Sequence, residues 1–382
     1  MVRLVRRGCS MRSVAAKLRV DVSTVSYWVD RAAARRLDRI DFSDQKTGRA
    51  SNRTSHAVEE HIVQLRKTLR EHSELGEYGA AAIHSQLVAE LAHPPSVATV
   101  NRVLARRGLQ DGVRRIRRPA PPKGWYLPEV VAGRAELGCF DFVEGLKIVD
   151  GPVVDVLTAK SLHGALTDAW VVAKSTKSTL PCLLERWTRD GLPRYAQFDN
   201  DTVFQGAHQF ANTVGAVSRL CLQLSIVPVF AAPLEHGMQN TIESFNGLWQ
   251  AKVWQRHRVS GPSELQRRSD HYVAAHRART EALRETAPAR RRMPRNFTFN
   301  PQRPLAGHIV FVRRTTEKGH IRMLGQTFGV SPAWPHRLVR CEVDFDHHEI
   351  RCFALRRREP HDQPLLVTIP YHRPDKPFKG AL

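Results

Sequence analysis

The chain has 382 residues, of which 59 are Lys or Arg and 37 are Asp or Glu, so its formal net charge is +22. This length suits about two to four domains, and a hydrophobic content of 42% is enough to build buried cores. The positive charge predicts a polyanionic partner, because neutralised phosphates release counterions. The sequence contains neither an apolar run of about 18 residues nor an apolar leader after Met1. We therefore expect a cytoplasmic protein without a membrane partner.

Residues 8–36 carry apolar side chains at helical spacing, and a break at residues 19–21 predicts two helices joined by a short turn. Asp21 or Ser23 is suited to cap the second helix. The outer face of that helix shows Thr24, Tyr27 and Arg31. These side chains suit the bases and phosphates of a DNA major groove. We predict a DNA-binding helix-turn-helix over residues 1–40, with a small helical bundle of polar surface as the alternative.

A polar stretch over residues 41–56 is expected to link this unit to a second helical unit over 57–112. Three amphipathic helices are predicted there, and the third begins with Ser96 as its N-cap and ends at Gly108. The face of the third helix that points away from its valines carries Thr99, Arg102 and Arg106. We predict a second helix-turn-helix, and two such units on one chain indicate a long, bipartite DNA site.

Residues 113–127 are rich in proline and arginine, so we expect an extended linker instead of a helix. Its first half carries Arg114, Arg115, Arg117 and Arg118. These four side chains are suited to follow a DNA phosphate backbone. A solvated spacer is the alternative interpretation of the same composition.

From residue 125 onward, short apolar segments predict three consecutive strands, with Asp150 and Gly151 in the turn between the first two. The elements expected after them are a helix that ends at Gly191, a strand over 195–199, a helix over 208–216, a strand over 225–231 and a long helix from Gln239 to Trp254. This order predicts an α/β RNase H-like core over residues 128–275, with helices on both faces of its sheet.

Three carboxylates in this region are candidates for chemistry. Asp141 lies in the first strand between two phenylalanines, where an uncompensated charge is unfavourable. Asp199 ends the fourth strand, which neighbours the first in this fold, so both acids are expected at one edge of the sheet. Glu243 lies beside the buried face of the last helix. The three carboxylates are therefore expected to converge from three separate elements.

Three acids without a cationic neighbour repel one another, so we expect them to bind divalent cations. Carboxylate oxygens suit Mg²⁺ or Mn²⁺, which bind through a few carboxylates and the phosphates of a substrate. Two ions about 3.5–4 Å apart can activate the attacking oxygen and stabilise the leaving oxygen of an in-line phosphoryl displacement. Each acid alone is a weak signal, because a single strand Asp is more often structural and a helix Glu more often solvated.

The segments FDF around Asp141, FDND with Asp199 and HGMQNTIESFNGLWQ with Glu243 resemble the D, D, E signature of bacterial insertion-sequence transposases with a retroviral-integrase-like core. The resemblance covers nearly the whole chain. It implies that the three acids form a catalytic, metal-binding triad that holds two Mg²⁺ or Mn²⁺ ions. It also implies that Gln239 and Asn240 line the site.

The chain departs from this family at Asp201, where the family commonly has glycine. Glycine permits a tight turn, whereas an aspartate adds a charge beside the site and also accepts turn conformations. Three interpretations of Asp201 are open: it is tolerated, it shares the metal with Asp199, or it weakens activity.

After the core, residues 276–303 are expected to form a basic linker, and the alternating pattern over 304–358 predicts a small SH3-like β-barrel. The proline-containing tail over 359–382 is expected to be flexible. Lys252 and Arg256, on the extension of the Glu243 helix, are candidates for gripping DNA, and a solvated face is their alternative.

The leading interpretation is a DDE transposase, a polynucleotidyl transferase that binds the terminal inverted repeats of a mobile element. It would free a 3′-OH by cleavage and join that end to target DNA. The resemblance implies double-stranded DNA as partner, a homo-oligomer in the synaptic complex, and a bacterial cytoplasm in association with the nucleoid. Two rivals are a catalytically decayed transposase that acts only as a DNA-binding protein or regulator, and a structure-selective nuclease.

Overall fold

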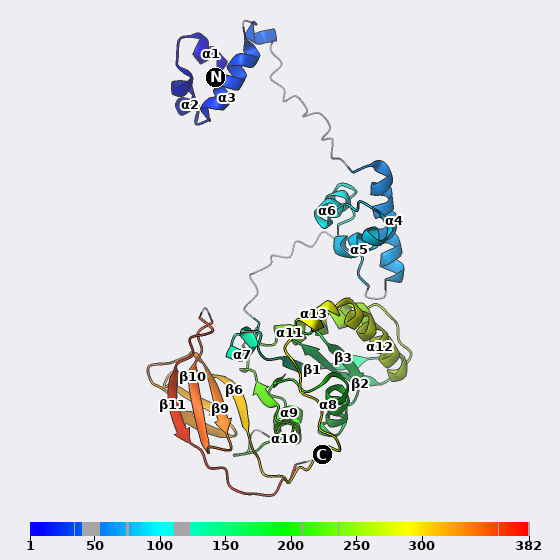
Figure 1. The fold of residues 1–382 in the computed structure, drawn as a ribbon, viewed down its shortest axis with the longest axis vertical. Coiled ribbons are helices and arrows are strands. Elements are labelled where there is room, and N and C mark those ends of the chain that lie inside the picture. Colours follow the sequence, from blue (N-terminus) through cyan, green and yellow to red (C-terminus); the bar gives the residue numbers. More distant parts are fainter. Residues whose placement is uncertain are drawn as a thin grey trace.

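The computed structural model describes residues 1–33, 35–39, 54–73, 76–110, 123–207, 209–235, 237–357 and 359–380. Figure 1 shows two small helical units and a larger α/β body, which contains the residues from 123 onward. No helix in the described part of the chain is both long and apolar enough to cross a lipid bilayer.

The first helical unit consists of α1 (Val2–Arg6), α2 (Met11–Leu18), α3 (Val22–Ala32) and the short 3-10 helix η1 (Leu37–Arg39). The predicted pair of helices is confirmed as α2 and α3, with Arg19 in the left-handed conformation between them at φ 52°. Asp21 caps α3, because its carboxylate accepts a hydrogen bond from Ser23 N at 2.8 Å. α1 precedes the predicted pair and buries Val2 against Ala32 of α3.

The second helical unit consists of α4 (His56–His72), α5 (Ala80–Glu90) and α6 (Val97–Arg106). These helices confirm the three amphipathic segments predicted from the sequence. Their small core is aliphatic and contains Ile62, Ile83, Leu87, Val100, Val103 and Leu104. Ser96 is the predicted N-cap of α6, and its hydroxyl accepts a hydrogen bond from Thr99 N at 3.3 Å.

The α/β body begins with α7 (Pro128–Val131) and contains the core strands β1 (Leu137–Lys147), β2 (Val153–Ser161), β3 (Thr167–Val171), β4 (Tyr195–Phe198) and β5 (Val227–Phe230). Its other helices are α8 (Thr176–Asp190), α9 (Thr202–Gln205), α10 (Ala216–Gln223), α11 (Asn240–Trp249), the π-helical turn η2 (Gln250–Trp254), α12 (Pro262–Arg279) and α13 (Ala282–Glu285). Asp150 takes φ 57° in the predicted β1–β2 turn, and Gly191 ends α8 as predicted.

Among the described residues, one mixed sheet has the strand order β11-β10-β9-β6-β5-β4-β1-β2-β3. β2 is antiparallel to β1 and β3, whereas β4 is parallel to β1 and β5 is parallel to β4. The order β3-β2-β1-β4-β5 and these directions are compatible with the RNase H-like core expected from the sequence.

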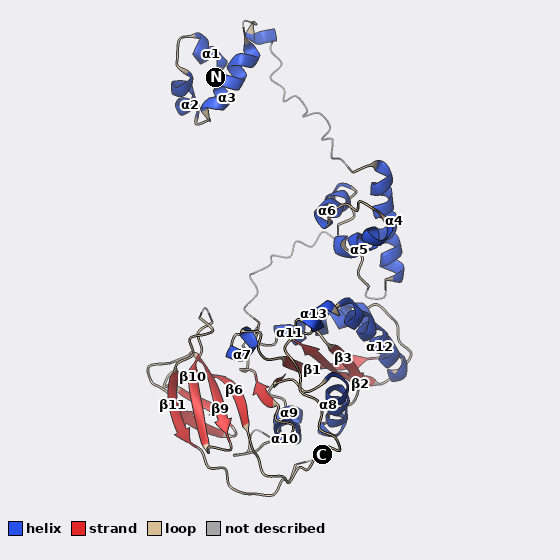
Figure 2. Cartoon of the chain, viewed as in Figure 1, coloured by secondary structure: helices blue, strands red, loops and turns tan. Residues whose placement is uncertain are grey.

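A hydrophobic cluster packs on each face of this sheet, and Figure 2 shows helices on both sides of the strands. On one face, Phe140 of β1 packs with α8 and α10 side chains that include Trp187. On the other face, Cys139 of β1 belongs to the cluster that contains Phe245 of α11. Successive residues of a strand point to opposite faces, so Asp141, two positions after Cys139, lies on the α11 face.

The C-terminal strands are β6 (His308–Arg314), β7 (His320–Met323), β8 (Gln326–Gly329), β9 (Leu338–Asp344), β10 (Glu349–Ala354) and β11 (Leu365–Pro370). β6 pairs in parallel with β5, with Phe311 opposite Phe230. The predicted SH3-like barrel over 304–358 is not confirmed. The main sheet is extended by β6, β9, β10 and β11, whereas β7 and β8 form a separate pair.

Three other expectations need correction. The helix predicted over 208–216 is wrong, because residues 209–215 are not helical and α10 begins at Ala216. A tight loop precedes α10, closed by a 2.9 Å hydrogen bond from Gly215 N to Gln205 O. Residues 365–370 of the expected flexible tail form β11, which pairs with β10.

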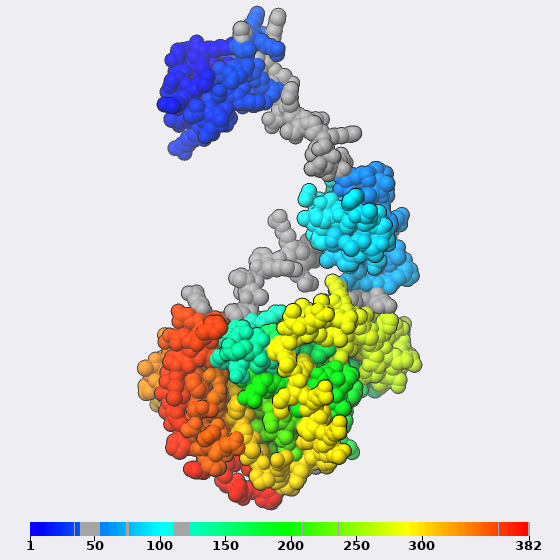
Figure 3. Space-filling view, viewed as in Figure 1, coloured from blue at the N-terminus to red at the C-terminus, as the bar shows by residue number. Residues whose placement is uncertain are grey.

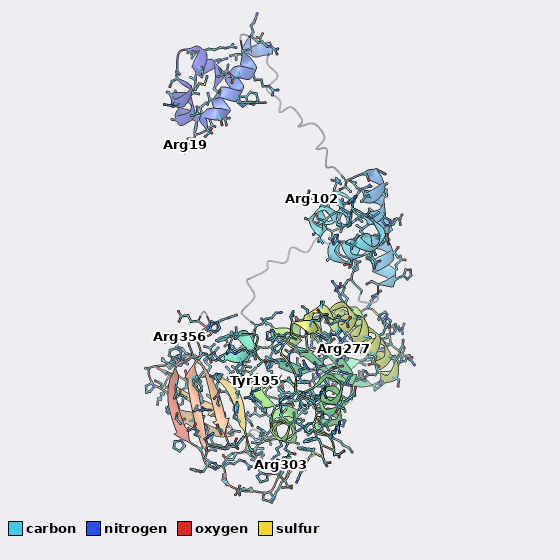
Figure 4. The ribbon with its side chains drawn as sticks, in the orientation of Figure 1. Arg19, Arg102, Tyr195, Arg277, Arg303 and Arg356 are labelled. Carbon is cyan, nitrogen blue, oxygen red and sulfur yellow. The ribbon has the colours of Figure 1, made fainter. Side chains whose placement is uncertain are left out.

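The expected basic linker over 276–303 is partly helical, since α12 continues to Arg279 and α13 follows. Arg277, labelled in Figure 4, pairs with Asp168 and Asp190, at 2.8 Å in each case. Figure 3 shows that the segment after α12, in yellow, crosses the surface of the core. Part of the basic charge in this segment is therefore neutralised by ion pairs within the protein.

Candidate functional site

Strand pairing brings two of the predicted acids to the same level of the sheet. β1 pairs in parallel with β4, and Cys139 lies opposite Gln197. The same register, continued for two residues, brings Asp141 level with Asp199, which directly follows the last residue of β4. The sequence-based expectation that these acids lie on neighbouring strands is confirmed.

Asp141 is half-buried and is held by two hydrogen bonds. Its Oδ1 accepts from Phe142 N at 2.9 Å, and its Oδ2 accepts from the Asn246 side-chain amide at 2.8 Å. Asn246 is in turn oriented by Thr158, whose hydroxyl lies 2.6 Å from the Asn246 carbonyl oxygen. Thr158 is directly opposite Asp141 in the β1–β2 pair. A strand residue and a helix residue therefore fix the Asp141 carboxylate.

The electrostatic environment of Asp141 opposes its ionisation. Burial is the main cause, the Asp199 carboxylate is the second, and Glu243 and Glu144 add smaller contributions. Together they outweigh the hydrogen bond from Phe142 N and raise the pKa of Asp141 from 3.8 to about 7. Asp141 therefore experiences the charges of both other members of the predicted triad.

Asp199 is also half-buried, and burial is the main cause that raises its pKa. Its Oδ1 accepts a hydrogen bond from Asp201 N at 2.9 Å. The Asp201 carboxylate raises the pKa of Asp199 further, whereas the Lys174 ammonium lowers it. Asp199 thus lies between a negative and a positive side chain that are both close to it.

Glu243 belongs to the first turn of α11, and its side chain is exposed. The helix is fixed by its opposite face, which buries Ile242, Phe245 and Trp249 as the sequence predicts. Gln239 is the N-cap position of α11 and is half-buried, while Asn240 is exposed. The rigid helix therefore positions the backbone at Glu243, while its carboxylate extends from the helix surface.

The donor chemistry of these acids fits a hard divalent cation, because carboxylate oxygens are the ligands that Mg²⁺ and Mn²⁺ prefer. Within the described residues, however, no group of three or more His, Cys, Asp or Glu side chains is gathered as a metal site. Asp141 and Asp199 share one level of the sheet, whereas Glu243 extends from the exposed surface of α11.

Asp201 has two structural roles. It is the N-cap of α9, since its Oδ1 accepts a hydrogen bond from Val203 N at 2.8 Å. Its Oδ2 lies 2.5 Å from the Lys174 ammonium, which also contacts Glu144 at 2.7 Å. Asp201 thus begins a helix and is paired with a cation. Lys174 was not identified from the sequence, because it follows β3 and is distant from the FDND motif along the chain.

Arg313 is a second residue that the sequence did not indicate. It comes from β6, is only 7% exposed, and donates to the Asn200 side-chain oxygen at 2.9 Å. Asn200 lies between Asp199 and Asp201, and its amide donates to Ala231 O at 2.8 Å. Burial lowers the pKa of Arg313 to about 10. The C-terminal strands therefore brace the loop that carries Asp199.

The predicted DNA-binding residues of the first unit lie on α3. Tyr27 is 54% exposed, and its hydroxyl accepts a hydrogen bond from the Arg31 guanidinium at 2.8 Å. Arg31 also stacks on the Trp28 ring, and Thr24 is half-buried. Tyr27 and Arg31 are thus oriented by each other on the outer face of α3.

The predicted residues of the second unit differ in their surroundings. Arg102 is exposed on α6, as Figure 4 shows, and Thr99 lies 3.1 Å from the Ser96 hydroxyl. Arg106 pairs with the buried Glu59 of α4, so it holds two helices of the unit together. The predicted contacts Arg114, Arg115, Arg117 and Arg118 lie outside the described residues.

Lys252 and Arg256 connect the core to the second helical unit. The Lys252 ammonium donates to Gly76 O at 2.6 Å, and the Arg256 guanidinium donates to Ser73 O at 2.6 Å. Gly76 takes φ 60°, and a Cβ atom there would lie 2.7 Å from the Arg256 guanidinium. The structure thus assigns both predicted DNA-gripping side chains contacts within the chain.

No protein-family model matches the sequence, and no curated protein matches it. Among solved structures, the catalytic core domain of BIV integrase matches with a TM-score of 0.28 and 13% sequence identity. The match covers 36% of this chain and 81% of the integrase chain. A TM-score this low does not establish a common fold.

Proposed function

We propose that this chain is a DDE transposase, a divalent-metal-dependent polynucleotidyl transferase that cleaves the ends of a mobile element and joins them to target DNA. One observation carries the proposal. The β1–β4 register brings the half-buried Asp141 level with Asp199, and the carboxylates of Asp199 and of Glu243 in α11 both raise the pKa of Asp141. Carboxylates in such mutual repulsion are typical of sites that bind cations.

In this proposal Asp141, Asp199 and Glu243 hold two Mg²⁺ or Mn²⁺ ions. Bound ions would polarise the attacking oxygen and stabilise the leaving oxygen of an in-line displacement at phosphorus. Asn246 keeps the Asp141 carboxylate in one orientation. Water is the nucleophile in the cleavage step, and the 3′-OH that cleavage frees is the nucleophile in the joining step. Neither step requires a covalent bond to the protein.

The helical units supply the DNA-binding part of the proposal. We assign base and phosphate contacts to the outer faces of α3 and α6, where Tyr27, Arg31 and Arg102 lie. The net charge of +22 supports affinity for double-stranded DNA independent of sequence. Assembly of more than one chain on two paired inverted repeats, in a bacterial cytoplasm, completes the proposal.

A DNA-binding remnant without activity is the second candidate function, and one observation favours it. Within the described residues the three acids are not gathered as a metal site. The ion pair of Asp201 with Lys174 argues in the other direction, because it compensates the charge by which this chain departs from the resembling family.

The test uses the full-length protein, Mg²⁺ or Mn²⁺, and a labelled duplex that carries the DNA flanking the coding sequence. Nicked and joined strands are expected from the wild type and are expected to be absent from Asp199→Asn. Asp150→Asn is the matched control, because Asp150 lies in the exposed β1–β2 turn, where asparagine also accepts a positive φ. DNA binding without any product would refute catalysis, and cleavage without joining would favour a structure-selective nuclease.

A further inference from the structure

A pocket of about 530 Å³ lies where α11 begins, and Glu243 is one of the residues that line it. Its walls are the first turn of α11, the start of β1, the end of β2 and the segment that precedes α7. Leu137, Leu162 and Met238 contribute a buried apolar lining. Asn240 and Ser244 contribute polar groups near the mouth. The pocket is therefore continuous with the surface that carries a member of the proposed triad.

Two lysines line this pocket, Lys160 from β2 and Lys123 from the segment before α7. Neither ammonium group forms a hydrogen bond or ion pair with another residue that the structure describes. Lys174, by contrast, is bound to two carboxylates. Lys160 is half-buried, and burial together with the charge of Lys123 lowers its pKa. Glu243 lines the same pocket, but its carboxylate pairs with neither lysine among the described residues, so both ammonium groups are available to a negatively charged ligand.

The beginning of α11 adds a third favourable contribution. No side chain caps this helix of 10 residues, and Ile242 N already donates to Gln239 O, so the N–H groups available at the pocket wall are those of Asn240 and Thr241. The positive end of a helix dipole and free N–H groups favour phosphate oxygens. The ligand that matches two ammonium groups, a helix N-terminus and an apolar lining is a phosphate ester.

We propose that this pocket binds a phosphodiester group of the DNA strand on which Glu243 acts. The inference rests on the proposed function, because it takes DNA as the source of the phosphate. Lys160 contacts the phosphate from the sheet, Lys123 contacts it from the segment before α7, and α11 presents its N-terminus. The pocket thereby fixes the strand relative to Glu243, and Lys160 is a binding and positioning residue.

The test measures binding of a fluorescent DNA duplex in EDTA by anisotropy over a series of salt concentrations. Lys160→Met is compared with Lys147→Met, which removes one exposed charge from the same β1–β2 hairpin. Lys160→Met is expected to weaken DNA binding about 10-fold more than Lys147→Met does, because it removes one charge-assisted hydrogen bond to a phosphate. The slope of log affinity against log salt is expected to fall by about 1. Lys160→Arg is expected to restore both, and thermal melting checks that each variant folds.

Equal affinities and slopes for Lys160→Met and Lys147→Met would overturn the proposal. The proposal would also be overturned if inorganic pyrophosphate, followed by ³¹P NMR, bound through Lys160 while DNA binding did not depend on this residue. Failure of the proposed function is a separate result. If the wild type cleaves no DNA but the Lys160 effect on binding holds, the pocket is a DNA site on a protein without that activity.

Discussion

Removal of the Asp141 charge is expected to change how the stability of the metal-free protein depends on pH. The pKa of Asp141 is raised from 3.8 to about 7 in the folded state, so folding favours the protonated form. Ionisation of Asp141 lowers the free energy of unfolding. This loss is absent below the pKa of Asp141 in the unfolded state and grows as pH rises toward its pKa in the folded state. It amounts to about 2 kcal/mol at pH 5 and about 4 kcal/mol at pH 8. The asparagine of Asp141→Asn does not titrate. The free energy of unfolding of this variant, relative to that of the wild type, is therefore expected to rise by about 2–3 kcal/mol from pH 5 to pH 8.

The assay is denaturant unfolding in EDTA at pH 5 and pH 8, followed by tryptophan fluorescence. The substitution also changes hydrogen bonding by an amount that does not vary with pH, so the difference between the two pH values is the informative quantity. Asp150→Asn, in an exposed turn, serves as the control and is expected to behave as wild type. The reasoning is refuted if Asp141→Asn and wild type lose the same stability between pH 5 and pH 8.

Three further predictions concern side chains around the site. Asp201→Ala is expected to lower the free energy of unfolding by about 1–2 kcal/mol through loss of the α9 cap, and Asp201→Asn by less; equal losses would contradict the capping role. Asn246→Leu removes one hydrogen-bond partner from each of Thr158 and Asp141 and is expected to lower the free energy of unfolding by about 1–3 kcal/mol, measured by thermal unfolding; an unchanged melting temperature would show that the three side chains are not coupled. Arg256→Met is expected to loosen the second helical unit and to speed limited proteolysis between the units, whereas a wild-type cleavage rate would show that this contact does not hold the unit.

The core was predictable because its pattern is local. The apolar run around Phe140, the asparagine- and glycine-favouring turn at Asp150 and the helix end at Gly191 each identify an element from a few neighbouring residues. The order of these elements then determines which strands are neighbours, so Asp141 and Asp199 could be paired without coordinates.

The remaining features depend on contacts between distant segments, which a single sequence does not display. The sequence predicts Arg313 in a strand of a separate barrel, yet Arg313 contacts Asn200, which lies 113 positions earlier in the chain. The sequence predicts Lys174 at the end of an apolar strand, and only the fold brings it into an ion pair with Asp201. The misplaced helix over 208–216 has a related cause, since the loop before α10 closes through two glycine backbones, and the sequence gives little indication of their contact.

The parallel pairing of β5 with β6 limits how this protein can be divided into fragments. A fragment that stopped at the end of the expected linker, near residue 303, would leave one whole side of β5 without hydrogen-bond partners. It would also uncover Phe230, whose ring stacks on Phe311 at a centroid distance of 5.2 Å. An open, apolar strand edge of this kind promotes aggregation. Truncation at the boundaries that suit a free-standing catalytic domain is thus a poor route to crystals, and expression through β11 is the better choice.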